Sequence, residues 1–136
     1  MTQHASGPFD VTITPQKPDS EVAQAANLGR MTIDKQFRGD LDATSKGEMI
    51  ASGPVDAKGS GGYVAMERVT GTLNGRRGGF VLQHSATMTR GVPELSITVV
   101  PDSGTGELKG LVGKMNIVIA TDGKHSYTFD YAIGSQ

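Results

Sequence analysis

No segment of the chain longer than about one helical turn carries apolar residues at spacings of three and four, the pattern of an amphipathic helix. Apolar and polar residues alternate instead, for example in residues 9–13 and 95–99. A period of two is typical of strands that bury one face. Thr, Val and 19 Gly are also spread along the whole chain. We therefore expect an all-β fold, in which residues 21–28 and 104–112 could form short helical turns within connections.

Turn-forming residues divide the chain into eight candidate strands. The clearest turn signals lie at Gly39, Asn74, Gly91 and Asp122, where glycine follows or precedes a residue that tolerates a tight turn. The strands expected between the turns and loops are residues 7–15, 30–38, 41–53, 62–73, 77–88, 94–101, 113–120 and 126–133.

Eight short antiparallel strands would leave unpaired edges unless the sheet closes on itself. We therefore expect a closed eight-stranded antiparallel meander barrel, whose interior is either filled by side chains or holds one small ligand. A two-sheet β-sandwich is compatible with the same turn spacing and stays open as the alternative. The length of 136 residues fits a single domain at residues 1–136, with an ordered core at about residues 7–134.

Composition and charge exclude several classes of protein. The chain has no Cys, which excludes disulfides, thiolate metal sites and a Cys nucleophile. Its net charge of -1 supplies no basic field for binding phosphates. The start, MTQHASGPFD, does not read as a secretory signal, and no segment approaches the ~20 apolar residues of a membrane span. We expect a cytoplasmic protein with no nucleic-acid or membrane partner.

Asn74-Gly75 is the strongest hairpin signal in the chain. If these two residues form the loop, Leu73 pairs with Arg76, and the residue numbers of every cross-strand pair sum to 149. The register defines one mainly apolar face, made of Tyr63, Ala65, Glu67, Val69, Phe80, Leu82, His84, Ala86 and Met88. A loop longer or shorter by one residue would reverse the two faces.

Glu67 and His84 are the two titratable groups on that apolar face of the hairpin, and they lie diagonally across one strand pair, within reach of each other. Burial raises the pKa of a carboxylate unless a cation or hydrogen-bond donors hold it charged, and an imidazole can do either. The pair is therefore a candidate for catalysis or ligand binding. The alternative is a buried hydrogen bond that only tethers two strands. Ser85 points to the other face, which excludes a Ser–His dyad there.

The last expected strand carries an aromatic stripe of Tyr127, Phe129 and Tyr131, which is typical of a core or of a ligand wall. The expected ligand-binding residues are Tyr63, Glu67, Phe80, Leu82, His84, Tyr127, Phe129 and Tyr131. The three His residues lie in unrelated segments without Asp or Glu at a familiar ligand spacing. We expect neither a metal site nor a cofactor.

Four segments carry a family resemblance: MERVTGTLNGRRGGFVLQHSATM, VVPDSGTGELKGLVG, the FRGD turn and the closing YTFDY. They resemble a bacterial family of small uncharacterised proteins with an allene oxide cyclase-like barrel. The resemblance spans residues 9–133. It implies a closed eight-stranded meander with a pocket inside, and it brings neither an established activity nor catalytic residues. A shared fold does not confer the cyclase reaction.

Three functions remain open from the sequence. The first is binding of a small, largely apolar molecule, with Glu67 and His84 as polar anchors. The second is a cofactor-independent isomerase or cyclase in which Glu67 is the general base and His84 orients or protonates. The third is a structural or oligomeric module whose interior is filled. In each case we expect a homo-oligomer, because Val64, Met66 and Val81 leave apolar surface on the outer face.

Overall fold

The structure is a computed structural model that describes residues 2–53 and 59–134. The expected domain, residues 1–136, thus includes a few residues outside those described. The elements are β1 (Gln3–Gln16), α1 (Glu21–Ala26), β2 (Gly29–Phe37), β3 (Leu41–Ser52), β4 (Gly61–Leu73), β5 (Arg76–Thr89), β6 (Val92–Val99), β7 (Thr105–Gly106), β8 (Leu111–Ile119) and β9 (His125–Ile133).

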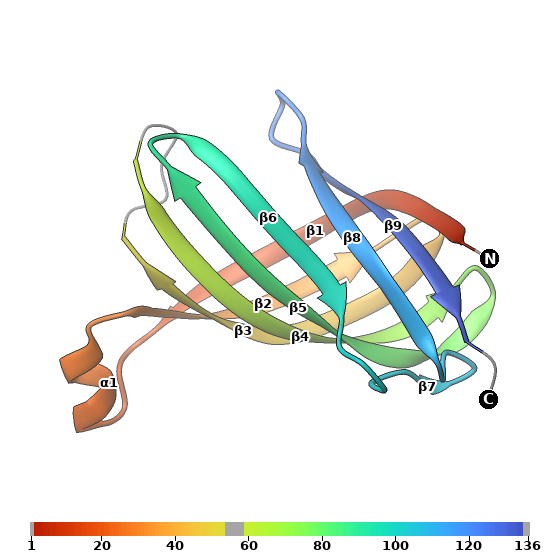
Figure 1. Ribbon diagram of the computed structural model, residues 1–136, viewed down its shortest axis with the longest axis horizontal. Coiled ribbons are helices and arrows are strands. Elements are labelled where there is room, and N and C mark those ends of the chain that lie inside the picture. Colours follow the sequence, from red (N-terminus) through yellow and green to blue (C-terminus); the bar gives the residue numbers. More distant parts are fainter. Residues whose placement is uncertain (1, 54–58, 135–136) are drawn as a thin grey trace.

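Eight of these strands form a closed antiparallel barrel, which confirms the expected fold over the sandwich. Strands that follow one another in the chain are paired, and β9 returns to pair with β1 and close the ring. The short β7 lies outside the ring, against β5. Figure 1 shows the strands wrapped around one axis, with α1 projecting from one end and both termini at the other.

The loop between β4 and β5 sets the register of the hairpin. Asn74 has φ 47° and Gly75 has φ 86°, as a two-residue type I′ turn requires. The pairs run from Leu73 with Arg76 to Gly61 with Met88, so the predicted register is confirmed. Inward and outward faces therefore fall where the alternation of the two strands placed them.

The start of β6 differs from the expected one. A two-residue loop at Arg90 and Gly91, with φ 46° and 86°, lets the strand begin at Val92 rather than at residue 94. Pro93 is tolerated in the strand because β6 pairs with β8 at only two residue pairs, both further along, so the strand has a free edge around the proline.

One of the two expected helical turns forms. Ser20 caps α1 by accepting a hydrogen bond from the Ala23 amide, and Asn27 ends the helix in a left-handed conformation. Residues 104–112 form β7, a turn and the start of β8 instead of a helix. Gly106 and Gly110 have φ 60° and 87° there, which no right-handed helix accommodates.

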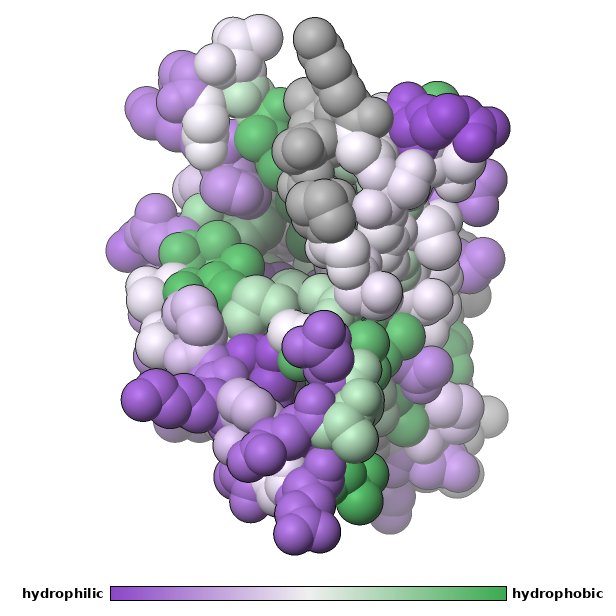
Figure 2. Space-filling view, turned by 90° about the vertical axis from the view of Figure 1, so that its left-hand side faces the viewer, coloured by the Kyte–Doolittle hydropathy of each residue, from purple (hydrophilic) through white to green (hydrophobic). Residues whose placement is uncertain are grey.

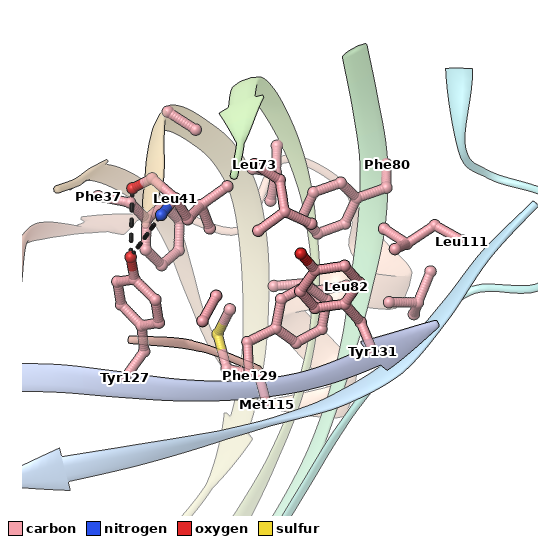
Figure 3. Close-up of a cluster of buried hydrophobic side chains, with 14 of the residues drawn as sticks. Phe37, Leu41, Leu73, Phe80, Leu82, Leu111, Met115, Tyr127, Phe129 and Tyr131 are labelled. Atoms are coloured by element: carbon pink, nitrogen blue, oxygen red, sulfur yellow. Dashed lines mark hydrogen bonds between the residues drawn. The ribbon is translucent and has the colours of Figure 1, made fainter. Parts of the chain in front are cut away.

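The interior is unevenly filled along the barrel axis. The half near the termini is packed by side chains from both ends of the sequence (Figure 3), which include Phe37, Leu41, Leu73, Phe80, Leu82, Leu111, Met115, Tyr127, Phe129 and Tyr131. The Tyr127 hydroxyl accepts a hydrogen bond from the Leu41 amide at 2.8 Å and donates one to the Arg38 carbonyl at 2.6 Å, so this buried phenol is satisfied. Burial of each large apolar side chain contributes about 1.5–3 kcal/mol.

Candidate functional site

A charged cluster lies in the barrel interior, centred on Glu67 in β4. The Glu67 side chain has no exposed surface, and both its oxygens accept hydrogen bonds. His84 Nε2 lies 2.6 Å from Oε1, and Lys35 Nζ lies 2.9 Å from the same oxygen. Ser45 donates its hydroxyl to Oε2 at 2.5 Å. Four strands, β2, β3, β4 and β5, thus meet at one carboxylate.

The donors around Glu67 hold it ionised. Burial is the largest single effect on the Glu67 carboxyl, and it raises the pKa. The hydrogen bond and charge of His84, the charge of Lys35 and the hydrogen bond from Ser45 together outweigh burial and lower the pKa from 4.5 to about 2. A carboxylate that is ionised at neutral pH needs a proton on the facing nitrogen, which makes His84 Nε2 a donor and leaves Nδ1 as its second polar atom.

Lys35 and Ser45 are the members of the cluster that we did not predict. Lys35 is only 6% exposed and its ammonium lies 5.1 Å from the ring centre of Phe9 and 5.5 Å from that of Phe37. Alternation carried a usable signal, because Lys35 has the same parity as Ile33 and Phe37, and both of these are buried. Ser45 has the same parity as Leu41 and Ala43 in β3.

The cluster lies next to a cavity in the half of the barrel that is not packed. The cavity measures about 190 Å³ and opens at the end of the barrel from which α1 projects. Figure 2 looks onto this end and shows apolar residues grouped across it between hydrophilic ones. The lining residues are Phe9, Val11, Ile13, Ile33, Lys35, Met49, Tyr63, His84, Leu95, Ile117, Ile119 and His125.

The residues expected to bind a ligand fall into three places. Tyr63 and His84 line the cavity. Glu67 lies behind them, with its side chain out of contact with solvent. The rest belong to the packed half of the barrel, where they form part of the hydrophobic core: Phe80, Leu82, Tyr127, Phe129 and Tyr131.

Tyr63 stands beside the imidazole at the cavity wall. The centres of the Tyr63 and His84 rings are 6.5 Å apart. Burial raises the pKa of the Tyr63 hydroxyl, and the negative charge of Glu67 raises it further. The phenol is therefore neutral at physiological pH and can donate or accept one hydrogen bond in the cavity.

Two features are absent from residues 2–53 and 59–134. No group of three or more His, Asp or Glu side chains in these ranges could hold a metal ion. In the same ranges, no helix is long and apolar enough to cross a membrane.

Fold and site together define a class: a small meander barrel, packed at one end, with a buried carboxylate cluster behind a cavity at the other. A family model described as "Protein of unknown function (DUF3224)" matches residues 5–131. The chain belongs to this DUF3224 family, in agreement with the resemblance to a family of uncharacterised proteins.

A solved structure supports the same assignment. It is a protein of unknown function from the DUF3224 family from Shewanella oneidensis MR-1, 44% identical in sequence, with a TM-score of 0.87. The similarity covers 99% of this chain and 100% of that one. No curated protein matches the chain.

Proposed function

We propose that the protein binds a small, largely apolar molecule in the cavity, with the polar end of that molecule at Lys35 and His84. The observation that carries the proposal is the cavity itself: an apolar wall with two buried polar side chains on one side of it. Small-molecule sites are commonly of this kind, because apolar walls supply affinity and a few polar groups fix orientation.

The size of the cavity limits its occupant. A cavity of about 150 Å³ lined by Leu, Ile and Phe holds one benzene molecule. At about 190 Å³, the cavity suits a ring of that size with one small substituent. Ile13, Leu95 and Ile119 line the cavity and remain 47%, 40% and 64% exposed, so a longer apolar tail could continue past the rim.

Glu67 has an indirect part in this proposal. Its two oxygens are already occupied by three donors and its side chain has no exposed surface. Glu67 therefore holds Lys35 and His84 in place, and these two side chains meet the ligand. The hydrogen-bonded carboxylate fixes the orientation of the imidazole, as a carboxylate partner commonly does for histidine.

An enzymatic role is the second candidate, and the 2.6 Å contact between His84 and Glu67 is the observation in its favour. We expected Glu67 to be the general base. A carboxylate with a pKa of about 2 is a weak base at neutral pH, and this one does not line the cavity. Proton abstraction from a bound molecule would therefore fall to His84, with Glu67 as the residue that positions it. A binding role requires fewer assumptions.

A titration with toluene, followed by methyl NMR, tests the binding proposal. We expect saturable shifts in the methyl groups of Ile33, Met49 and Ile117, which line the cavity. Ile117→Phe should remove most of this binding because the larger side chain fills the space. Val118→Phe is the matched control, since Val118 is the next residue in β8 and is 51% exposed on the outer wall.

Two outcomes would contradict the proposal. In the first, toluene at its solubility limit leaves the cavity methyl groups unshifted. In the second, Ile117→Phe and Val118→Phe bind toluene equally well. Either result would favour the third function considered above, a barrel with no ligand.

A further inference from the structure

The described residues that line the cavity include a cationic side chain but no acidic one. Among the described lining residues, the titratable ones are Lys35, Tyr63, His84 and His125, and none is Asp or Glu. The nearest carboxylate, Glu67, has no exposed surface and already accepts three hydrogen bonds. The cavity wall therefore presents one ammonium and two imidazoles, and no carboxylate, to whatever occupies it.

Lys35 has hydrogen-bonding capacity to spare. Its ammonium carries three N–H donors, and among the described residues the one oxygen that accepts from it is Glu67 Oε1. The remaining donors lie beside the rings of Phe9 and Phe37, which interact with the charge but are not oxygen acceptors. A buried ammonium gains from a further acceptor, because its lost hydration is then replaced more fully.

The charges of the cluster decide whether the acceptor that binds there can be an anion. The charges of Glu67 and Lys35 cancel each other, so a bound anion is compensated only when His84 carries a proton on both ring nitrogens. His84 is placed to take that proton on Nδ1, since its Nε2 already faces Glu67. The charged and titratable groups around the imidazole are Glu67, Lys35, Tyr63 and, on the opposite strand β9, His125.

We infer that the ligand of the cavity is a small organic acid, bound as its anion between the Lys35 ammonium and a protonated His84. The inference rests on the binding function proposed above and narrows it to one chemical class. The carboxylate of the ligand accepts a hydrogen bond from each of the two side chains, and its apolar body fills the space between the strands. Such charge-assisted bonds are about twice as strong as neutral ones.

Three probes of nearly equal shape test the inference: benzoate, benzamide and benzylamine, with toluene as the apolar reference. Affinities are measured by calorimetry and by the shifts of the cavity methyl groups at pH 6. We expect benzoate to bind at least tenfold more tightly than benzamide. Benzylamine, a cation at this pH, should bind most weakly. Raising the pH to 8.5 should weaken benzoate binding and leave benzamide unchanged, because only the anion requires the proton on His84.

The outcomes separate the inference from the function on which it rests. If toluene and benzamide bind but benzoate does not, or if benzylamine binds most tightly, the ligand is not an organic acid and the inference is wrong. The proposed binding function would still hold, because the cavity binds small molecules in both cases. If none of the four probes shifts the cavity methyl groups, both the inference and the binding function are wrong. If benzoate binding does not depend on pH, the part of the inference that requires a protonated His84 is wrong.

Lys35→Met provides the test at the residue level, because it keeps the length of the side chain and removes the charge. The preference for benzoate over benzamide should fall to within about twofold. Lys46→Met is the matched control: the Lys46 side chain is 71% exposed on the outer wall, and its ammonium pairs with Asp34 at 2.7 Å. Equal loss in both variants would contradict a role for Lys35. If Lys35→Met does not fold, the four-probe comparison on the unaltered protein still decides the matter.

Discussion

Glu67 is a buried carboxylate that remains charged because three donors surround it. Burial of an isolated charge is costly, whereas a charge with complete hydrogen bonding can be retained inside a protein. The four side chains of the cluster come from four strands. The cluster therefore joins the two halves of the barrel interior at one point, where the packed core ends and the cavity begins.

Acid should destabilise the protein through Glu67. The pKa is about 2 in the folded state and 4.5 as the ordinary value. A lowered pKa contributes stability above pH 4.5, and that contribution disappears as the pH falls toward 2. The shift corresponds to about 3 kcal/mol. Chemical denaturation at pH 7, 5, 3 and 2 should show this loss in the natural protein and not in Glu67→Gln.

Glu67→Gln itself should lower the free energy of unfolding at pH 7 by about 3–5 kcal/mol, because Lys35 is left without its counter-charge. Glu67→Gln combined with Lys35→Met is the control. It removes both charges and should be less destabilised than the sum of the two single variants. Strict additivity, or a Glu67→Gln protein as stable as the natural one, would mean that the pair is not coupled.

The Glu67–His84 contact was predictable, and the contact with Lys35 was not. One local signal, the Asn74-Gly75 loop, fixes the pairing of β4 with β5 and brings Glu67 and His84 to one face. Lys35 reaches Glu67 from β2, which is separated from β4 by all of β3. The curvature of the closed sheet decides this contact, and no short stretch of sequence encodes it. Alternation indicates that Lys35 points inward but does not identify its partner.

At the scale of the strands, a glycine makes room for the cluster. Gly47 in β3 is paired with Glu67, and a Cβ atom at Gly47 would lie 2.2 Å from the Met66 carbonyl oxygen and 2.8 Å from the Glu67 Cβ. Real Cβ atoms do not approach backbone so closely. The absence of a side chain at Gly47 therefore allows β3 and β4 to approach each other beside the carboxylate.

Gly47→Ala should destabilise the protein by about 1–3 kcal/mol, because the strands must separate to admit the methyl group. Gly29→Ala is the matched control in a strand, since the nearest atom to its added Cβ lies at 3.6 Å. That change should be neutral within ~0.5 kcal/mol. Thermal denaturation of the two variants measures the difference. Equal stability would show that the strands relax at Gly47 without cost.

Most elements followed from turn chemistry and alternation, and the exceptions depend on pairing between distant segments. The expected strands agree with the observed ones within two residues except at the start of β1, which begins at Gln3 rather than at residue 7 because residues 3–6 pair with β9 where the barrel closes. Residues 104–112 formed no helix because pairing of β7 with Gly78 and Gly79 holds them against β5. That pairing joins segments about 27 residues apart and has no local signature.

At the scale of the whole molecule, the closed barrel leaves an apolar area on its outer wall. Ile50, Val64 and Met66 of β3 and β4 are 46%, 55% and 49% exposed and lie together at a hollow flanked by Arg30 and Glu48. Arg30 and Glu48 pair with each other at 2.9 Å within one copy, so the apolar residues are what the hollow offers to a second copy related by a two-fold axis. A second copy of the chain is the partner that this arrangement favours.

The expected self-association remains a prediction, and Val64→Glu tests it. Light scattering at micromolar concentrations should give the mass of a dimer or larger oligomer for the natural chain and of a monomer for Val64→Glu, because the carboxylate would be buried in the contact. Val112→Glu is the control on β8, where Val112 is 55% exposed away from the hollow. A monomeric mass for the natural chain, or dissociation by both variants, would contradict an interface at this surface.

Closure of the barrel also constrains how the chain can be made. β1 pairs on one side with β9, and the bonded partners include Gln3 with Tyr131 and Phe9 with His125. β1 is synthesised long before β9, so the growing polypeptide carries an unpaired strand edge until β9 has emerged from the ribosome. Such late, sequence-distant pairing is intrinsically slow and leaves nascent chains open to aggregation. The ring can close only once β9 has been synthesised, and the cavity forms only then, because β8 and β9 supply Ile117, Ile119 and His125 to its wall.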